Sequence, residues 1–220
     1  IRGIIVTLAE AKVDFALCAP TGRAAKRLEE ASGKPATTIH RLLEYSKGGR
    51  FERNSSHPLD VNIVVCDEAS MIDVELMGSL MNALGDRTAL VLVGDIDQLP
   101  PVGPGQPFRD IIKSGRVEVA YLNQNFRQAE NSGIPAAAMA VNSGGIPKEG
   151  VDTDLDDFHF ISRNDAEGCQ TAIREFLSRL PVLRGGRYDH IRDVQVLTPM
   201  NKGPLGTSSL NQLIKNIVNP

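Results

Sequence analysis

Two stretches of the chain place acidic and amide side chains directly after short apolar runs. Asp67 and Glu68 follow the run Ile63–Cys66, and Gln98 lies in GDIDQLPPVG after a second run, Ala89–Val93. In nucleotide hydrolases, one such carboxylate holds Mg²⁺, usually through a water, and its neighbour polarises the attacking water. A glutamine nearby can hydrogen-bond a γ-phosphate or that water. The alternative is two solvated acids and a proline-rich turn.

These side chains need elements that bring them together. Short β-branched runs are typical of buried strands in a parallel sheet, and ligands bind where the carboxyl ends of such strands meet. The spacing between Asp67 and Gln98 accommodates one helix and one neighbouring strand. We therefore expect both strand ends to reach the same rim of the sheet.

The remaining elements follow from periodicity and from capping residues. Strands are expected at Phe15–Ala19, Ile63–Cys66, Ala89–Val93, Val117–Leu122, Phe158–Ile161 and Val194–Leu197. Helices are expected at Ile1–Ala11, Arg23–Ala31 (capped by Thr21), from Thr37 to about Tyr45, Val74–Leu84, Phe108–Ser114, Ile134–Asn142, Ala166–Leu180 and Ser208–Val218. Strands that alternate with helices predict an α/β fold with a parallel sheet covered on both faces. The pattern restarts near residues 127–133, which predicts one core over 1–128 and part of a second over 129–220.

Composition narrows the class of protein. The chain of 220 residues is 41% hydrophobic with a mean hydropathy of -0.15, a net charge of -3 and a pI near 5.8, so it lacks a global basic surface. Residues 20–60 nevertheless hold eight Lys or Arg and five Asp or Glu, a local balance of +3 that fits a nucleic-acid groove. Three widely spaced cysteines and no apolar run long enough to span a membrane predict a soluble, cytoplasmic protein with free thiols and no membrane partner.

Several stretches together resemble one family of motor proteins. Beside DEAS and GDIDQLPP, these are CAPTGRAAKRL (Cys18–Leu28), ATTIHRLL (Ala36–Leu43), LNQNFRQ (Leu122–Gln128) and VQVLTPMNKGPLGTSSLN (Val194–Asn211). In combination they are similar to superfamily 1 DNA helicases, and specifically to the RecD-like family of exodeoxyribonuclease V alpha subunits. The resemblance covers nearly the whole chain and is weakest at residues 46–60 and 145–190.

The resemblance implies two RecA-like cores that clamp ATP and Mg²⁺ between them and step 5′ to 3′ along single-stranded DNA in repair or recombination. Asp67 matches the metal-binding acid, Glu68 the water-activating acid and Gln98 the phosphate-sensing glutamine. Arg127 matches the arginine that neutralises charge on the transferring phosphoryl group, a role that suits a guanidinium fork. A surface salt bridge is the alternative for Arg127.

The resemblance also implies a surface for single-stranded DNA and duplex junctions. The matching positions are Pro20, Thr21, Gly22, Arg23, Thr38, His40, Thr198 and Lys202. The Thr38 hydroxyl could equally cap a helix, and His40 is favoured slightly as a packing residue. Thr198 and Lys202 could lie in an ordinary strand-to-helix loop. Residues 46–60 could form a β-hairpin, which in this family acts as a pin that splits the duplex.

The chain also departs from the family pattern. The phosphate-binding sequence G-x-x-x-x-G-K-[ST] does not occur in the 220 residues. The chain starts at Ile1 within an expected helix and ends at Pro220 after another, so we expect a piece of a longer protein that neither hydrolyses ATP nor unwinds DNA alone. Other subunits of an exodeoxyribonuclease V complex are possible partners. Two alternatives stay open: the helicase portion of a conjugative relaxase, and a RecA-like core that binds DNA or a partner without catalysis.

Overall fold

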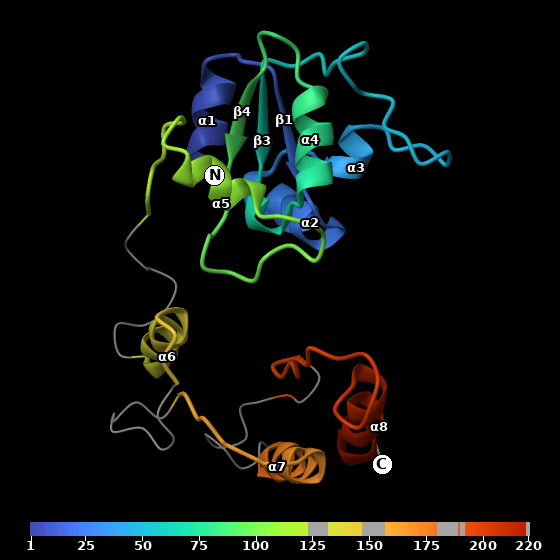
Figure 1. Ribbon diagram of the computed structural model, residues 1–220, viewed down its shortest axis with the longest axis vertical. Coiled ribbons are helices and arrows are strands. Elements are labelled where there is room, and N and C mark those ends of the chain that lie inside the picture. The colour runs from blue at the N-terminus through green and yellow to red at the C-terminus, as the bar shows by residue number, and fades with distance from the viewer. Residues whose placement is uncertain (123–131, 147–156, 180–188, 190–191, 219–220) are drawn as a thin grey trace. The chain divides into compact units, whose positions relative to one another are not determined.

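The computed structural model describes residues 1–122, 132–146, 157–179, 189 and 192–218. The chain divides into two compact units, Ile1–Asn123 and Gln124–Pro220. Figure 1 shows the first unit in blue to yellow-green, and each unit is described by itself below.

The first unit is built on a sheet of four parallel strands: β1 (Phe15–Ala19), β2 (Ala36–Thr38), β3 (Ile63–Cys66) and β4 (Ala89–Leu92). Their order across the sheet is β2-β1-β3-β4. At the carboxyl end, Cys18 of β1 lies opposite Cys66 of β3, and Cys66 lies opposite Leu92 of β4. The three longer strands therefore end level with one another, and the predicted parallel α/β fold is confirmed.

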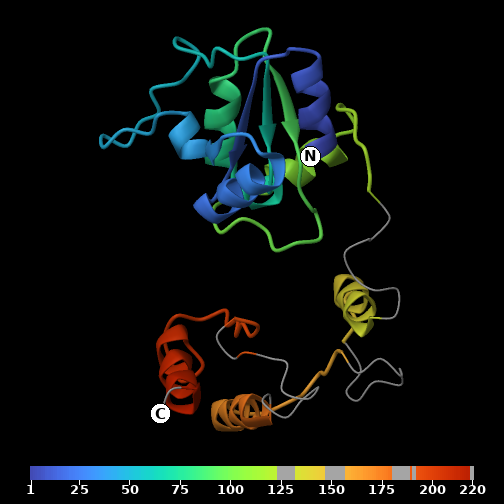
Figure 2. The same ribbon diagram turned by 180° about the vertical axis from the view of Figure 1, so that it is seen from behind.

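Helices cover both faces of this sheet (Figures 1 and 2). They are α1 (Arg2–Glu10), α2 (Gly22–Ser32), α3 (Ile39–Leu42), α4 (Val74–Asn82) and α5 (Pro107–Lys113). On one face Val65 of β3 packs in a cluster with Ile5 of α1 and Leu28 of α2. Val64 and Cys66 belong to the other cluster, which holds buried residues of α3, α4 and α5. This alternation along β3 is what a strand buried on both sides requires.

The connection from α2 to α3 corrects one expectation. The helix expected from Thr37 starts only at Ile39, because Ala36–Thr38 pairs with β1 as strand β2. Thr38 then caps α3, with its hydroxyl oxygen 3.2 Å from the Arg41 amide that donates to it. A three-residue strand carries too little periodicity to be read from the sequence, and its pairing partner decides its conformation.

Residues 46–60 form two tight antiparallel turns. The first brings Tyr45 opposite Phe51, and the second brings Asn54 opposite His57. Arg53 links the segment to the end of α3 through an ion pair with Glu44, at 2.9 Å between nitrogen and oxygen. The segment that follows α3 thus consists of two consecutive short turns, each closed by one antiparallel bridge.

The second unit contains α6 (Gly133–Asn142), α7 (Ala166–Arg179) and α8 (Thr207–Val218) among its described residues. The helix predictions here agree with the structure. The expected strands at Phe158–Ile161 and Val194–Leu197 are wrong, as is the one at Val117–Leu122 in the first unit, because none of these segments pairs with another strand among the residues that the structure describes. Among the described helices, none combines the length and the apolar character that a membrane span requires.

Candidate functional site

The acidic pair lies where β3 ends between its two neighbours. The backbone amide of Asp67 donates to the carbonyl of Cys18 in β1, at 2.9 Å. On the other side, the Val93 amide donates to the Cys66 carbonyl and the Ala69 amide to the Val93 carbonyl, both at 2.8 Å. The turn that carries Asp67 and Glu68 is therefore fixed by hydrogen bonds from both adjacent strands.

Glu68 has an unusual backbone conformation. Its φ of 53° and ψ of 38° lie in the left-handed region, and a 3-10 helix, η1 (Ala69–Met71), begins directly after it. A non-glycine residue in this region is strained by about 1 kcal/mol. The Glu68 amide donates to Oδ1 of Asp67 at 2.9 Å, which ties the two acids together. Backbone strain of this kind is frequent at functional sites, where surrounding contacts maintain it.

The acids suit a magnesium ion chemically. Both are half-buried, and within the described parts of the chain no group of three or more potential metal ligands occurs. Mg²⁺ commonly takes only one or two carboxylates from the protein and completes its shell with water and substrate phosphate. Asp67 uses one oxygen for the Glu68 amide, so its other oxygen fits a metal-bound water.

Gln98 belongs to the long connection between β4 and α5. This connection is anchored near its start, where a Cβ on Gly94 would lie 2.9 Å from the Ser70 nitrogen and 3.1 Å from Cε1 of Phe108. It is anchored again where the Val74 amide donates to the Pro104 carbonyl at 3.0 Å. Gln98 itself is exposed between these two anchors. In the parallel register, β3 and β4 end at one edge of the sheet, as predicted, and the acidic pair and the connection that carries Gln98 both start there.

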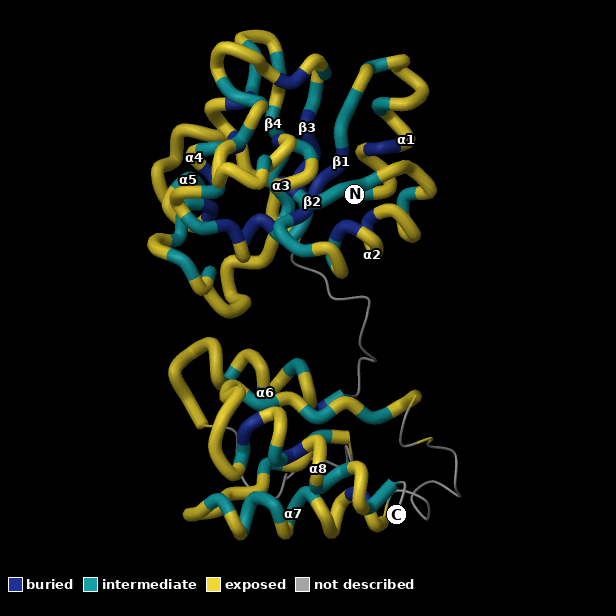
Figure 3. Tube along the Cα trace, turned by 90° about the vertical axis from the view of Figure 1, so that its right-hand side faces the viewer, coloured by how far each residue is buried: buried dark blue, intermediate teal, exposed yellow. Residues whose placement is uncertain are grey.

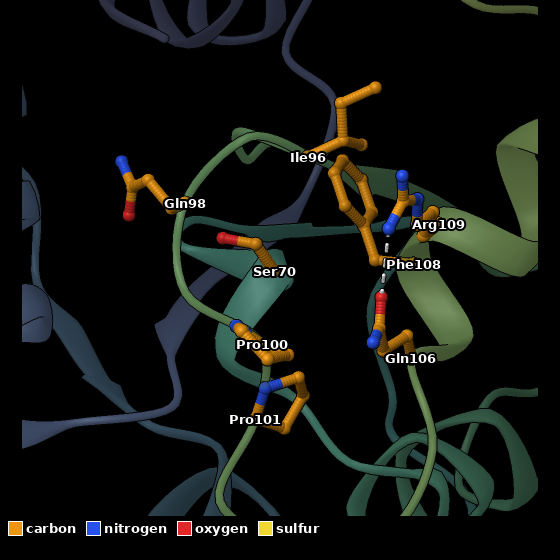
Figure 4. Close-up of a pocket in the computed structure, with 8 residues that line it drawn as sticks. All are labelled: Ser70, Ile96, Gln98, Pro100, Pro101, Gln106, Phe108 and Arg109. Atoms are coloured by element: carbon orange, nitrogen blue, oxygen red, sulfur yellow. Dashed lines mark hydrogen bonds between the residues drawn. The ribbon is translucent and has the colours of Figure 1, made fainter. Parts of the chain in front are cut away.

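A small hollow of about 20 Å³ lies beneath this connection (Figure 4). Its walls are Ser70, Ile96, Gln98, Pro100, Pro101, Gln106, Phe108 and Arg109. Ser70 is 9% exposed, and its hydroxyl has no hydrogen-bond partner among the described residues. On the opposite wall Nη1 of Arg109 donates to Oε1 of Gln106 at 3.5 Å.

Ser70 and Arg109 were not among the residues predicted from the sequence. Ser70 lies in the same DEAS stretch as the acidic pair, but its burial and its missing partner depend on how the later connection folds over it. Arg109 follows Phe108 in α5, which the sequence predicts as a short helix over Phe108–Ser114. No local pattern marks either residue.

Two buried thiols lie directly behind the acidic pair. Cys18 and Cys66 are fully buried and opposite each other in the β1–β3 register. A hydrogen bond with the Cys18 side chain, burial, and the charges of Cys18 and Asp67 raise the pKa of the Cys66 thiol far above its ordinary range. Both cysteines are free, as predicted, and Cys66 stays protonated.

The predicted DNA-contacting residues of the first unit lie at the ends of β1 and β2. Pro20 and Thr21 connect β1 to α2, and Gly22 and Arg23 are the first residues of α2. The Thr21 hydroxyl caps α2 by accepting from the Ala24 amide at 3.2 Å. The capping role predicted for Thr21 is confirmed, and Thr38 caps α3 in the same way.

His40 packs against an aromatic pair in the segment after α3. The His40 ring lies edge-on to Tyr45, with centroids 5.4 Å apart, and 5.6 Å from Phe51. Tyr45 is half exposed, so this cluster reaches the surface. The packing role favoured for His40 agrees with these contacts.

The other predicted site residues belong to the second unit or fall outside the described residues. Thr198 belongs to the second unit, where its hydroxyl donates to the Leu205 carbonyl at 2.6 Å and closes the loop before α8. Lys202 is exposed in the same loop. Arg127 lies outside the described residues.

Comparison with known proteins places the whole chain among helicase sequences. Residues 1–104 match the family model described as "AAA domain". The chain is 38% identical over 208 residues to the ATP-dependent RecD2 DNA helicase of Deinococcus radiodurans, covering 94% of this chain and 27% of that protein. It is 36% identical to the RecBCD enzyme subunit RecD of Haemophilus influenzae, covering 96% of this chain and 45% of that subunit. The chain therefore spans between about a quarter and a half of these relatives.

Among solved structures, Bacteroides Pif1 bound to single-stranded DNA aligns with 79% of this chain and 49% of its own, with a TM-score of 0.44 and 15% sequence identity. The complex of Bacteroides Pif1 with ADP-AlF4 aligns with 51% of this chain and 29% of its own, with a TM-score of 0.32 and 22% identity.

Proposed function

The chain belongs to the RecD-like family of helicases, and from this premise we propose that it is part of a motor that hydrolyses ATP to move 5′ to 3′ along single-stranded DNA. Because the chain spans only part of its relatives, the proposal concerns the activity of the full-length protein. Repair or recombination of DNA in the cytoplasm is the setting that this family membership suggests.

One observation carries the proposal. Cys66 of β3 and Leu92 of β4 lie opposite each other in parallel strands, and the turn after β3 is hydrogen-bonded to Val93. The Asp67–Glu68 pair and the connection that carries Gln98 therefore start from adjacent positions on one sheet edge. This is the edge where parallel α/β proteins bind nucleotides.

In this proposal each acid has a separate role. Asp67 holds Mg²⁺ through a water, and the metal would offset negative charge on the phosphates. Glu68 accepts a proton from the attacking water, for which its half-buried position next to Asp67 suits a carboxylate base. Gln98 hydrogen-bonds the terminal phosphate and changes partners when that phosphate leaves.

Two further components of the motor come from the resemblance. Arg127 supplies the guanidinium that neutralises charge on the transferring phosphoryl group, a contribution of about 10³–10⁵ in rate in related chemistry. A G-x-x-x-x-G-K-[ST] sequence is not present in these 220 residues. We therefore expect the 220 residues alone to show neither ATP hydrolysis nor DNA unwinding.

DNA binding is proposed for the loop Pro20–Arg23 and for the segment around Thr38 and His40. The amides that start α2 and the Arg23 guanidinium suit a DNA phosphate, while the Thr21 and Thr38 hydroxyls already cap helices. We therefore expect backbone amides and Arg23 to dominate phosphate binding in the first unit. Thr198 and Lys202 are proposed as the corresponding contacts of the second unit, and other exodeoxyribonuclease V subunits as possible partners.

Two other functions fit parts of the same sequence. The helicase portion of a conjugative relaxase would carry an additional domain with a tyrosine nucleophile and a three-histidine metal site. A non-catalytic core would lack the lysine of the phosphate-binding loop. Both are decided by reading the complete coding sequence of the protein.

The proposal is tested with Glu68→Gln in the full-length protein, with Glu75→Gln as a matched control on the exposed first turn of α4. We expect Glu68→Gln to lower DNA-stimulated kcat by about 10²–10⁴-fold while ATP binding persists, because a general base contributes that much. Glu75→Gln should keep the wild-type rate. Equal rates for the two variants, or a wild-type protein without ATPase activity, would refute the proposal.

The direction of movement needs a separate experiment. Duplexes with a single-stranded 5′ tail or a single-stranded 3′ tail are offered to the full-length protein with ATP. We expect unwinding of the 5′-tailed substrate only. Preferential unwinding of the 3′-tailed substrate would contradict the assigned polarity.

A further inference from the structure

The Ser70 hydroxyl stands out among the serines of the first unit. Those of Ser32, Ser79 and Ser114 each donate to a backbone carbonyl three or four residues earlier in the chain. Ser70 is 9% exposed and makes no such bond within the part of the chain that the structure describes. Buried hydroxyls are nearly always paired, so an unpaired one at a functional edge calls for a partner that arrives in another state.

The surroundings of Ser70 limit what this partner can be. In Figure 4 the hydroxyl is turned toward the loop that carries Gln98, and the Gln98 amide lies on the outer side of that loop. The hollow between them measures about 20 Å³, which admits one small polar group. Its other walls are the apolar Ile96, Pro100, Pro101 and Phe108 and a polar pair, Gln106 and Arg109, whose side chains are hydrogen-bonded to each other.

Hydrogen bonds fix the backbone around Gln98, so its side chain can rotate without a large shift of the loop. Its amide donates to the Asp95 carbonyl at 3.3 Å, and Asp95 also accepts from the Asp97 amide through Oδ1 at 2.9 Å. A Cβ added to Gly94 would lie 2.9 Å from the Ser70 nitrogen, so the start of the loop packs closely against the backbone of Ser70. Rotation of the exposed Gln98 side chain about its own bonds is therefore the available route to Ser70.

We propose that Ser70 is a positioning residue for Gln98: when nucleotide is bound, the Ser70 hydroxyl donates a hydrogen bond to the side-chain oxygen of Gln98. This inference rests on the proposed ATP hydrolysis and assigns a residue that the resemblance does not. A glutamine amide has one acceptor oxygen and one donor NH₂ group. With the oxygen held by Ser70, the NH₂ group is directed to a phosphate oxygen.

The test is a double-mutant cycle on the full-length protein, with Ser70→Ala, Gln98→Ala and the double variant. The control is Ser79→Ala, which removes an exposed hydroxyl that donates to the Glu75 carbonyl at 2.8 Å. We expect Ser70→Ala to lower kcat about three- to tenfold, as for loss of one hydrogen bond, with the KM for ATP nearly unchanged. In the Gln98→Ala background the same change should have no further effect.

Stability separates positioning from a structural role. The hydroxyl of Ser70 has no partner among the described residues, so Ser70→Ala should leave the melting temperature of the nucleotide-free protein unchanged or slightly raised. A lowered melting temperature, an unchanged kcat, or additive effects of the two substitutions would overturn the inference while leaving the proposed function in place. A wild-type protein without ATPase activity would instead overturn the proposed function itself.

A structure with a nucleotide analogue provides an independent readout. We expect the Ser70 hydroxyl within hydrogen-bond distance of the Gln98 side-chain oxygen. A Gln98 amide turned outward, with an ordered water on the Ser70 hydroxyl, would also overturn the inference.

Discussion

The two units of the chain bury their apolar side chains to very different extents (Figure 3). In the first unit β1 and β3 are dark blue over most of their length, with helices packed on both faces. In the described part of the second unit the buried large apolar side chains are Leu177 and Leu210. Leu197, in a segment expected to be a strand, is 81% exposed.

This difference shows what a strand needs that a helix does not. The helices of both units satisfy their own backbone hydrogen bonds, so α6, α7 and α8 form with few buried contacts. A strand satisfies its backbone only through a neighbour. Val194–Leu197 is apolar except at Gln195 but has no paired neighbour among the described residues, and it therefore forms no strand.

The largest expected effect comes from opening a cavity in each unit separately. Leu80 of α4 is fully buried against the sheet, so Leu80→Ala should lower the free energy of unfolding of the first unit by about 2–5 kcal/mol. Leu210→Ala in α8 should lower the free energy of unfolding of the second unit only, and by a smaller amount. Few buried side chains surround Leu210, so the cavity collapses more easily. Hydrogen exchange of backbone amides, read unit by unit, measures both effects.

The same experiment tests the division into two units. If Leu80→Ala weakened the protection of α7 and α8 as strongly as that of β3 and β4, the units would unfold as one and the comparison would fail. Phe176→Ala, which removes a half-exposed side chain of α7, serves as the control and should change little.

The sequence predicted those parts of the fold and site that depend on local pattern. The apolar runs Ile63–Cys66 and Ala89–Val93 were sufficient to predict two parallel strands that end at a common edge. A strand buried on both faces is apolar at every position, and this pattern can be recognised in the sequence. Strand β2 was missed because three residues depend on β1 for their pairing. Ser70 was missed because its burial comes from Gly94 and Phe108, which approach it only in the folded chain.

A smaller effect is expected where the first unit brings backbones into close contact. A Cβ at position 94 would lie 2.9 Å from the Ser70 nitrogen, so Gly94→Ala should cost about 1–3 kcal/mol through overpacking. Gly3→Ala in α1, where no atom lies within 4 Å of the added carbon, is the control and should be neutral or stabilising by up to about 1 kcal/mol. Denaturant unfolding monitored on the first unit measures both, and equal effects would show that the close approach at Gly94 relaxes freely.

Helix caps should contribute similarly in the two units, because a cap is a local interaction. Thr21→Ala removes the acceptor of the Ala24 amide in α2, and Ser132→Ala removes the acceptor of the Ile134 amide in α6. Each should cost about 1 kcal/mol in its own unit. Thr21→Ser and Ser132→Thr keep the hydroxyls and should restore most of that stability. A cap effect confined to the first unit would mean that burial also determines how much a cap contributes.

The last effect is absent at neutral pH and distinguishes Cys66, a buried thiol of the first unit, from Cys169 in α7, which is only half-buried. The raised pKa keeps Cys66 protonated in the folded state, whereas the thiol of the unfolded chain ionises above about pH 8.5. The contribution of Cys66 is therefore fully present below pH 8.5 and is lost as pH rises, by at most about 1.4 kcal/mol per pH unit. Cys66→Ala should remove this dependence, and Cys169→Ala should not, as measured by unfolding between pH 7 and 10. An unchanged pH dependence in Cys66→Ala would show that the thiol ionises in the folded protein, and the tight β1–β3 packing behind the acidic pair would then be open to solvent.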